Sequence, residues 1–197
     1  MRLSRLGVPL LLGLLIASAC TTKNEGVSTP IPGETENIVD SAPYLCGLVP
    51  ERAFRLVSGV TKSFEERATG TGDNGNCQVP AVEPGLLEVV WIQETSGSSR
   101  EYLDDLMDDR RKVFTRHGAM KLSSDLGEGY AVYFPEGPFS DRPYQVTARF
   151  PCGGKDRIVD LALAKVAKGR DGIKDMVELM RIAQKRYGLL HRCTPGA

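Results

Sequence analysis

The sequence contains few of the residues on which most catalytic sites depend. It has only two histidines, His117 and His191, among 197 residues. It also lacks a G-x-S-x-G serine elbow and an H-E-x-x-H zinc motif. A cysteine or serine nucleophile needs a base that a third group holds in place. His117 ends an expected helix, where a cation is favourable, and His191 lies in a basic stretch near the C-terminus. We therefore predict no catalytic residues and a protein that is not an enzyme.

The chain also lacks an excess of charge of either sign. Lysine and arginine number 25, and so do aspartate and glutamate. Residues 1–19 contain Arg2 and Arg5 and no acid, so the remaining chain carries a formal net charge of −2. This balance provides no basic surface for nucleic acid or for an anionic membrane. We expect no nucleic-acid partner.

Long apolar runs are scarce, and the one that exists lies at the N-terminus. It spans residues 6–16, follows Arg2 and Arg5, and is too short to cross a bilayer. The small residues of "ASA", 17–19, follow it. This order is typical of a secretory signal peptide, and we assign residues 1–19 to one. No second long apolar run follows, and 41% of the residues are apolar, a value typical of globular proteins.

The residue after the "ASA" site is Cys20, which leaves two possibilities open. Signal peptidase can cut and release the chain, or bacteria can attach a lipid to the cysteine. Five cysteines are present, an odd number, and an exported chain meets an oxidising compartment where disulfides persist. If the other four pair, Cys20 is left over, and a free exposed thiol is a liability there. We therefore expect Cys20 to be the lipidation site, with the membrane as partner through a diacylglyceryl anchor.

The remaining cysteines are Cys46, Cys77, Cys152 and Cys193, and they allow three connectivities. We prefer Cys46–Cys77, which would tie the start of the first helix to the strand after a glycine-rich loop. We also prefer Cys152–Cys193, which would tie the penultimate hairpin to the tail. Zinc is disfavoured because no C-x-x-C spacing occurs and neither histidine lies at a usual ligand offset. We predict no metal and no cofactor.

Composition and periodicity predict three segments: a signal peptide over 1–19, a lipidated cysteine with a flexible tether over 20–41, and one domain over 42–197. Apolar stripes predict helices over 50–59, 99–117 and from 171 to near 188. Strands are expected over 62–70, 86–93, 144–150 and 157–166, and also where "AMKLSSDLGEG" (119–129) leads into "YAVYFPEG" (130–137). The 144–150 strand alternates cleanly, as in a sheet with one buried face. The expected fold is α+β, a mostly antiparallel sheet covered by about three helices and stapled by disulfides.

Three other patterns have simple structural explanations. The stretch "GTGDNG", residues 70–75, satisfies G-x-G-x-x-G, but no helix follows it, so we expect a loop rather than a dinucleotide site. Four aspartates within 104–109 are expected to form a solvated helix face beside basic residues rather than a cation site. Met176 and Met180 are expected to fill the core.

Several of these features together resemble a known family. They are "ASAC", the tether, "YLCGLVPERAFRLVSG", the cysteine of "NCQV", "DLGEGYAVYF" and an amphipathic C-terminal helix. The chain resembles, over most of residues 42–188, the actinobacterial envelope lipoproteins of the domain of unknown function 3558 family. Cys46 and Cys77 match the family's cysteine pair. Two features depart from the family. Its members often have Leu-Leu-Thr after the first cysteine, where this chain has Gly47-Leu48-Val49-Pro50. They often have a tryptophan just after the second cysteine, whereas the only tryptophan here is Trp91, in the next expected strand.

The resemblance implies a location and an architecture, and no activity. We expect a non-catalytic binding or structural module, anchored by lipid at the extracytoplasmic face of the cell membrane, with an envelope protein as a possible partner. The alternative is a carrier of a lipid or a small apolar ligand, in a pocket between sheet and helices. An enzyme is the third hypothesis, which would require a cleft that places a histidine against an acid and a hydroxyl.

Overall fold

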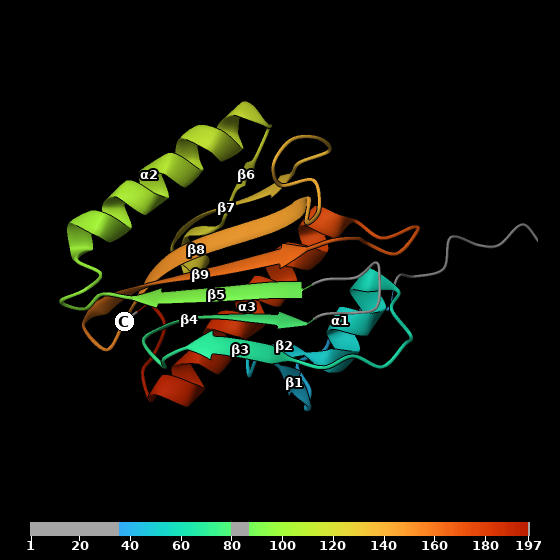
Figure 1. Ribbon diagram of the computed structural model, residues 1–197, viewed down its shortest axis with the longest axis horizontal. Coiled ribbons are helices and arrows are strands. Elements are labelled where there is room, and N and C mark those ends of the chain that lie inside the picture. Colours follow the sequence, from blue (N-terminus) through green and yellow to red (C-terminus); the bar gives the residue numbers. More distant parts are fainter. Residues whose placement is uncertain (1–35, 80–86, 197) are drawn as a thin grey trace, which may run out of the picture. The chain divides into compact units, whose positions relative to one another are not determined.

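The computed structural model describes residues 36–79 and 87–196 (Figure 1). The expected signal peptide, Cys20, the tether as far as residue 35 and the first residue of the expected 86–93 strand lie outside the described residues. The described helices are α1 (Glu51–Ser58), α2 (Arg100–Arg116), α3 (Gly172–His191) and the 3-10 helix η1 (Ser124–Leu126). The described strands are β1 (Tyr44–Leu45), β2 (Val49–Pro50), β3 (Arg67–Gly70), β4 (Asn74–Val79), β5 (Leu87–Gln93), β6 (Met120–Lys121), β7 (Glu128–Tyr133), β8 (Tyr144–Cys152) and β9 (Lys155–Leu163).

Seven of these strands form one antiparallel sheet, in the order β3-β4-β5-β9-β8-β7-β6. Strands β1 and β2 form a separate two-stranded ribbon ahead of α1. The predicted α+β class, with a mostly antiparallel sheet and three α-helices, is confirmed. The strand expected over 86–93 is present as β5, which lies between β4 and β9 inside the sheet.

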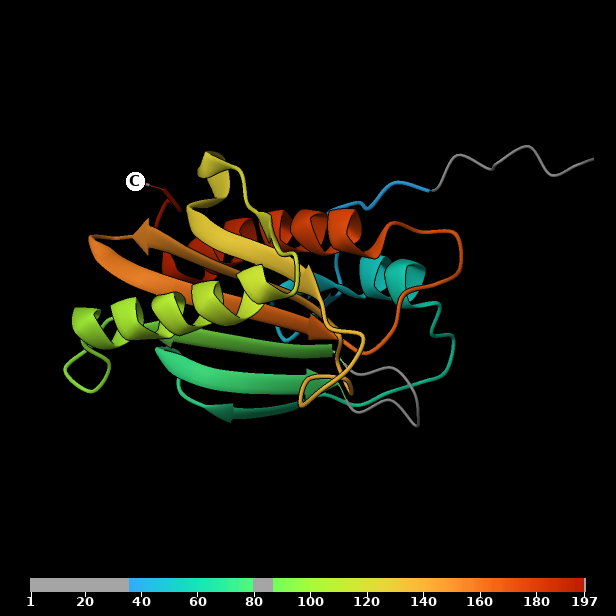
Figure 2. The same cartoon turned by 90° about the horizontal axis from the view of Figure 1, so that it is seen from above.

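The helices cover both faces of the sheet (Figures 1 and 2). Helices α1 and α3 lie on one face and α2 lies on the other. Because side chains alternate along a strand, neighbouring residues enter different cores. In β9, Val159 packs with α1 and α3, whereas Ile158 packs with Leu103 and Met107 of α2. The expectation that the 144–150 strand has one buried face was therefore wrong: Thr147, on its second face, is also buried.

Capping residues define where two helices begin. The side chain of Ser99 accepts a hydrogen bond from the Tyr102 amide at the start of α2, and Asp171 does the same for Lys174 at the start of α3. Helix α1 follows Pro50 and ends at Gly59, whose φ of 70° is the left-handed conformation of a helix C-terminus.

Helix α3 continues to His191, past the predicted end near Gly188. A Cβ atom on Gly188 would lie 2.6 Å from the Cys193 carbonyl oxygen and from the Pro195 ring. This glycine therefore permits the tail to fold back against the helix, and it does not end the helix.

The strand expected over 62–70 is shorter than predicted, because only residues 67–70 pair with β4. The preceding segment packs on α1 instead. The Phe64 ring lies 5.4 Å from the Phe54 ring, edge to face, and 4.4 Å from the Arg55 guanidinium. These contacts hold residue 64 against the helix and away from the sheet.

The folded unit begins before residue 42, the boundary we expected. Ile38 packs against the core, and Asp40 accepts hydrogen bonds from the Tyr44 hydroxyl, at 2.8 Å, and from Lys185, at 2.7 Å. Residues 36–41, which the composition assigned to the tether, therefore belong to the compact unit that contains the rest of the described chain.

Two leucines on α3 test how the core stabilises the fold. Leu179 is fully buried beneath the helix, whereas Leu189 is 61% exposed on the same helix. Leu179→Ala should lower the free energy of unfolding by about 2–5 kcal/mol, because it removes buried methyl groups and leaves a cavity. The matched control Leu189→Ala has the same change in helix propensity and should stay within about 0.5 kcal/mol of the parent. Urea denaturation measures both, and equal losses would contradict the described packing.

Candidate functional site

A cavity of about 570 Å³ lies between α2 and the sheet, on the face opposite α1 and α3. Its lining comes from α2, from β5, β8 and β9, and from the loop over residues 134–143 that joins β7 to β8. This volume falls in the range of sites that bind small molecules. We call it the α2 pocket.

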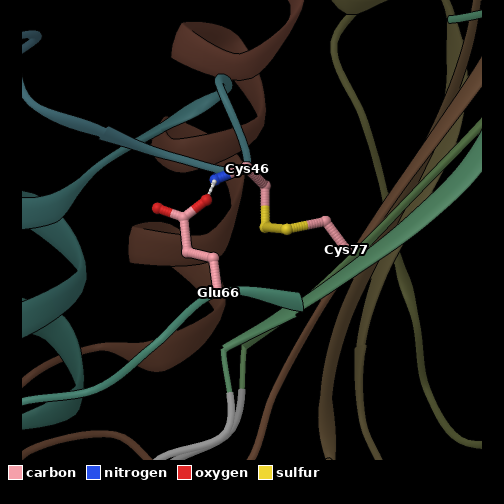
Figure 3. A group of neighbouring side chains, drawn as sticks. All are labelled: Cys46, Glu66 and Cys77. Atoms are coloured by element: carbon pink, nitrogen blue, oxygen red, sulfur yellow. Dashed lines mark hydrogen bonds between the residues drawn. A yellow bond between two sulfur atoms is a disulfide. The ribbon is translucent and has the colours of Figure 1, made fainter. Parts of the chain in front are cut away.

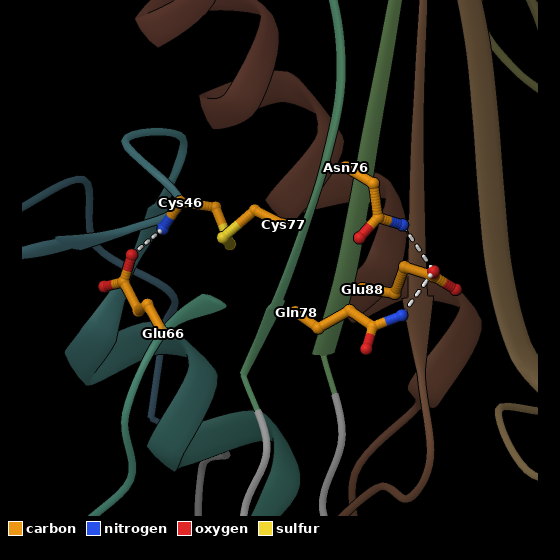
Figure 4. Close-up of a disulfide and its surroundings, with 6 residues drawn as sticks. All are labelled: Cys46, Glu66, Asn76, Cys77, Gln78 and Glu88. Carbon is orange, nitrogen blue, oxygen red and sulfur yellow. Dashed lines mark hydrogen bonds between the residues drawn. A yellow bond between two sulfur atoms is a disulfide. The ribbon is translucent and has the colours of Figure 1, made fainter. Parts of the chain in front are cut away.

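One acidic side chain at the floor of the α2 pocket is Glu88 of β5. It accepts hydrogen bonds from the side-chain amides of Asn76 and Gln78 on β4 (Figure 4). Its second oxygen pairs at 2.9 Å with the guanidinium of Arg142, which comes from the β7–β8 loop. The Glu88 and Arg142 side chains are 19% and 22% exposed. The ion pair therefore connects the loop to the sheet across one end of the pocket.

The second acidic side chain of the floor is Asp160 of β9. It accepts hydrogen bonds from the Thr147 hydroxyl on β8 and from the guanidinium of Arg110 on α2. The Arg110 and Asp160 side chains are 20% and 21% exposed. A half-buried carboxylate without partners would carry a large desolvation cost, and here each oxygen has a donor. The pair also links α2 to the sheet where the cavity separates them.

Apolar side chains form the walls above this polar floor. Leu106, Val113 and Phe114 project from α2, and Phe139 comes from the β7–β8 loop. Three aromatic rings are in contact there: Phe134 lies 5.3 Å from Phe114 and 5.1 Å from Phe139. Phe139 is 39% exposed. The α2 pocket is thus amphipathic, with paired charges on its floor and apolar walls.

The sequence analysis did not identify these residues as a site. A signal for two of them exists, because Glu88 and Asp160 are single acids within otherwise apolar strand segments, "LLEVV" and "IVDLAL". An acid at such a position indicates a polar partner on that face of the sheet. Arg110 and Arg142 carried no comparable signal, since Arg110 lies among other charged residues and Arg142 follows Asp141 in a loop.

The structure contains both preferred disulfides, and this prediction is confirmed. Cys46 and Cys77 join the loop before α1 to β4, with 5.6 Å between their Cα atoms (Figure 3). Cys152 and Cys193 join the β8–β9 hairpin to the chain beyond α3, with 5.3 Å between their Cα atoms. Each disulfide lowers the conformational entropy of the unfolded chain by closing a loop, which stabilises the fold by about 4 kcal/mol.

Cys46, Cys77 and Glu66 bring three potential metal-ligating side chains together. The two sulfur atoms are bonded to each other, and a thiolate rather than a disulfide sulfur is the metal ligand. The Glu66 carboxylate accepts a hydrogen bond from the Cys46 amide at 2.8 Å (Figures 3 and 4). Cys46 has a φ of 53°, uncommon for a residue with a side chain. The group therefore supports the loop conformation at the disulfide.

The α2 pocket and the Cys46–Cys77 disulfide lie on opposite sides of β4. Figure 4 shows Cys77 projecting from the strand to one side, and the Asn76 and Gln78 amides projecting to the other side toward Glu88. The strand therefore separates the covalent link from the pocket.

The two histidines lie on opposite faces of the sheet. His117 follows α2 and packs edge-on against Phe134, with ring centroids 4.9 Å apart. His191 ends α3 and stacks on Tyr187 at 4.0 Å. Among the hydrogen bonds of residues 36–79 and 87–196, none involves a histidine side chain. The cleft that would favour an enzyme, with a histidine against an acid and a hydroxyl, is not formed by these residues.

Most of the other sequence patterns take the positions expected of them. Residues 71–73 of "GTGDNG" form the turn between β3 and β4, as expected, whereas Gly70, Asn74 and Gly75 belong to the strands on either side. Met176 and Met180 are fully buried. Asp108 and Asp109 pair with neighbouring basic residues of α2 at the surface. Asp104 differs from the expectation, since it reaches the sheet and pairs with Arg149.

In comparisons with protein-family models, with curated proteins and with solved structures, nothing matched this chain. The resemblance to the domain of unknown function 3558 lipoproteins therefore stays a prediction. None of the helices in the described part of the chain is both long enough and apolar enough to cross a membrane.

His191 generates a prediction for the pH dependence of stability. Burial, and secondarily the positive charge of Arg157, lower the pKa of His191 below its usual 6.5, while Asp73 opposes this shift. Because the unfolded chain then binds the proton more readily than the folded chain, stability should fall as pH decreases from 7.5 through the unfolded pKa. Urea denaturation at pH 7.5, 6.5 and 5.5 measures this loss. His191→Phe keeps a ring against Tyr187 and should reduce the loss, whereas the control His117→Phe should retain it. An unchanged pH dependence in His191→Phe would contradict the assignment.

Proposed function

We propose that this protein is a lipid-anchored binding module of the cell envelope, acting without catalysis at the extracytoplasmic face of the cytoplasmic membrane. The single observation that carries the binding function is the α2 pocket, whose volume of about 570 Å³ suits a small ligand. The two disulfides support an oxidising compartment, because such bonds persist outside the cytosol. In this proposal Cys20 carries a diacylglyceryl group, and its two chains are what stable anchoring requires.

The alternative function is a carrier that takes up and releases a lipid or a small apolar ligand. The position of the α2 pocket, between the sheet and a helix, favours it. The floor of the pocket opposes it, because a wholly apolar ligand would remove water from the Glu88–Arg142 and Asp160–Arg110 ion pairs without replacing its hydrogen bonds. The space between the sheet and α1 and α3 is filled by fully buried side chains such as Phe54 and Met176. An amphipathic ligand in the α2 pocket fits these observations better.

The anchor is tested by the mass of the mature N-terminal peptide. We expect a chain that begins at Cys20 and carries a diacylglyceryl group, and that remains in the membrane fraction. Cys20→Ser should abolish the added mass and move the protein to the soluble fraction. The matched control Thr21→Ser should leave both unchanged. An unmodified Cys20 on a released chain would overturn the anchored location.

The binding function is tested by photo-crosslinking in whole envelopes. One variant carries a photoreactive amino acid in place of Phe139 at the α2 pocket. A second variant carries it in place of Leu189, which is 61% exposed on α3, on the opposite face of the sheet. We expect a discrete adduct at position 139 that is absent at 189. Ala162→Phe, which fills the pocket from β9, should remove that adduct.

Three outcomes would separate the hypotheses. A discrete adduct that Ala162→Phe removes supports the binding module. Recovery of bulk lipid alone at position 139 would favour the carrier. Identical adducts at positions 139 and 189, unaffected by Ala162→Phe, would show that the α2 pocket is not the binding site.

A further inference from the structure

We propose that the ligand of the α2 pocket is a small cationic amphiphile, with an ammonium head at the mouth and an apolar body along the walls. This inference rests on the proposed binding function and adds the chemical class of the ligand. It begins from the charges of the lining. Four carboxylates and two guanidinium groups line the cavity, a net charge of −2.

The two guanidinium groups are already neutralised within the site. Arg110 pairs with Asp160 and also donates to the Leu106 carbonyl oxygen. Arg142 pairs with Glu88 at 2.9 Å. An anionic ligand would have to compete with a carboxylate for each arginine. The pocket therefore does not present a free positive charge to an anion.

The negative charge that remains lies on Asp109 of α2 and Asp141 of the β7–β8 loop. The Asp109 carboxylate is 76% exposed, and its ion-pair partner among the described residues is Lys112, at 3.4 Å along the helix surface. The Asp141 carboxylate is 62% exposed and lies 3.6 Å from Arg142, whose closer partner is Glu88. Both acids thus line the solvent-exposed mouth of the α2 pocket. A cation at the mouth would be attracted by either carboxylate at little desolvation cost, because both are largely exposed.

An exposed aromatic ring lines the same cavity as these acids. It belongs to Phe139, which lies in the same loop as Asp141 and is 39% exposed. Its contact with Phe134 at 5.1 Å keeps the ring in place. Ammonium groups bind over the faces of aromatic rings, and quaternary ammonium groups are commonly recognised in this way. Acids and an aromatic ring at the mouth favour a cationic head.

The apolar walls of the α2 pocket indicate the chemistry of the rest of the ligand. Leu106, Val113 and Phe114 form an apolar surface on α2 that continues inward from Asp109. A cavity of about 570 Å³ accommodates one alkyl or aryl body, whereas a folded protein partner binds across a surface of about 800 Å² rather than inside a cavity. We therefore assign the pocket to a small amphiphile and treat a basic peptide as an outcome of the test.

The test compares three probes that share one decyl chain: decyltrimethylammonium, decyl sulfate and decyl maltoside. Isothermal titration calorimetry below their micelle concentrations uses residues 20–197 with Cys20→Ser. We expect the ammonium probe to bind about tenfold or more tightly than the other two, and less tightly as salt increases. Ala162→Phe should abolish its binding.

Variants at the mouth locate the head group. Asp109→Asn and Asp141→Asn should each weaken the ammonium probe about threefold and leave decyl maltoside unchanged. Phe139→Ala should weaken it by about two- to fivefold. The matched control is Asp108→Asn, which changes an exposed acid on the same helix that pairs with Arg111 and does not line the cavity.

The outcomes test the class of the ligand and the binding function of the pocket separately. Equal or tighter binding of decyl maltoside or decyl sulfate, abolished by Ala162→Phe, would overturn the cationic class and keep the pocket as a binding site. Binding of an oligolysine probe without binding of the ammonium probe would overturn the small amphiphile in favour of a basic peptide. No binding of any probe, together with identical crosslinks at positions 139 and 189, would overturn both the ligand class and the binding function.

Discussion

The alternation of side chains along β5, β9 and β8 is the constraint on which the rest of the structure depends. Every second residue of these strands enters the core beneath α1 and α3, where Val89 and Val159 are fully buried. The residues between them face α2, and two of these are Glu88 and Asp160. A shift of register by one residue would exchange the two sets and bury carboxylates in the apolar core. The same alternation of side chains therefore places both the stabilising core and the polar floor of the α2 pocket.

The two faces of the sheet are packed differently. The α1 and α3 face is continuous and apolar, so it provides most of the hydrophobic stabilisation. On the other face, α2 contacts the sheet through smaller apolar groups near its two ends, around Leu103 and around Phe114. Between these groups the Arg110–Asp160 pair spans the gap. Because the main core lies on the other face, the fold does not need the space beneath α2 to be filled by apolar side chains.

The sequence predicts much of the fold because its strongest signals are local. The apolar stripes of α2 and α3 and the apolar run of β5 can each be recognised from neighbouring residues alone. Errors arose where distant contacts determine the outcome. Residues 62–66 are held by Phe64 against α1, and Gly188 accommodates the tail rather than ending α3. Neither contact leaves a pattern in its own segment.

The candidate site is less predictable from sequence, for the same reason. Its ion pairs join residues 50 and 54 positions apart, Arg110 with Asp160 and Glu88 with Arg142. A single acid within an apolar strand indicates that a partner exists, but the identity of that partner depends on strand order and on where α2 crosses the sheet. The disulfides were more predictable, because four cysteines allow only three connectivities.

The Cys46–Cys77 bond also has a mechanical consequence for an anchored domain. Tension applied through the N-terminal segment would first extend the residues before Cys46. The disulfide then transmits the load directly to β4, which pairs with β3 and β5 inside the sheet. Helix α1 and β3 lie within the covalent loop between Cys46 and Cys77, so pulling from the N-terminus does not lengthen them. A chain held at its N-terminus would thus resist unravelling from that end.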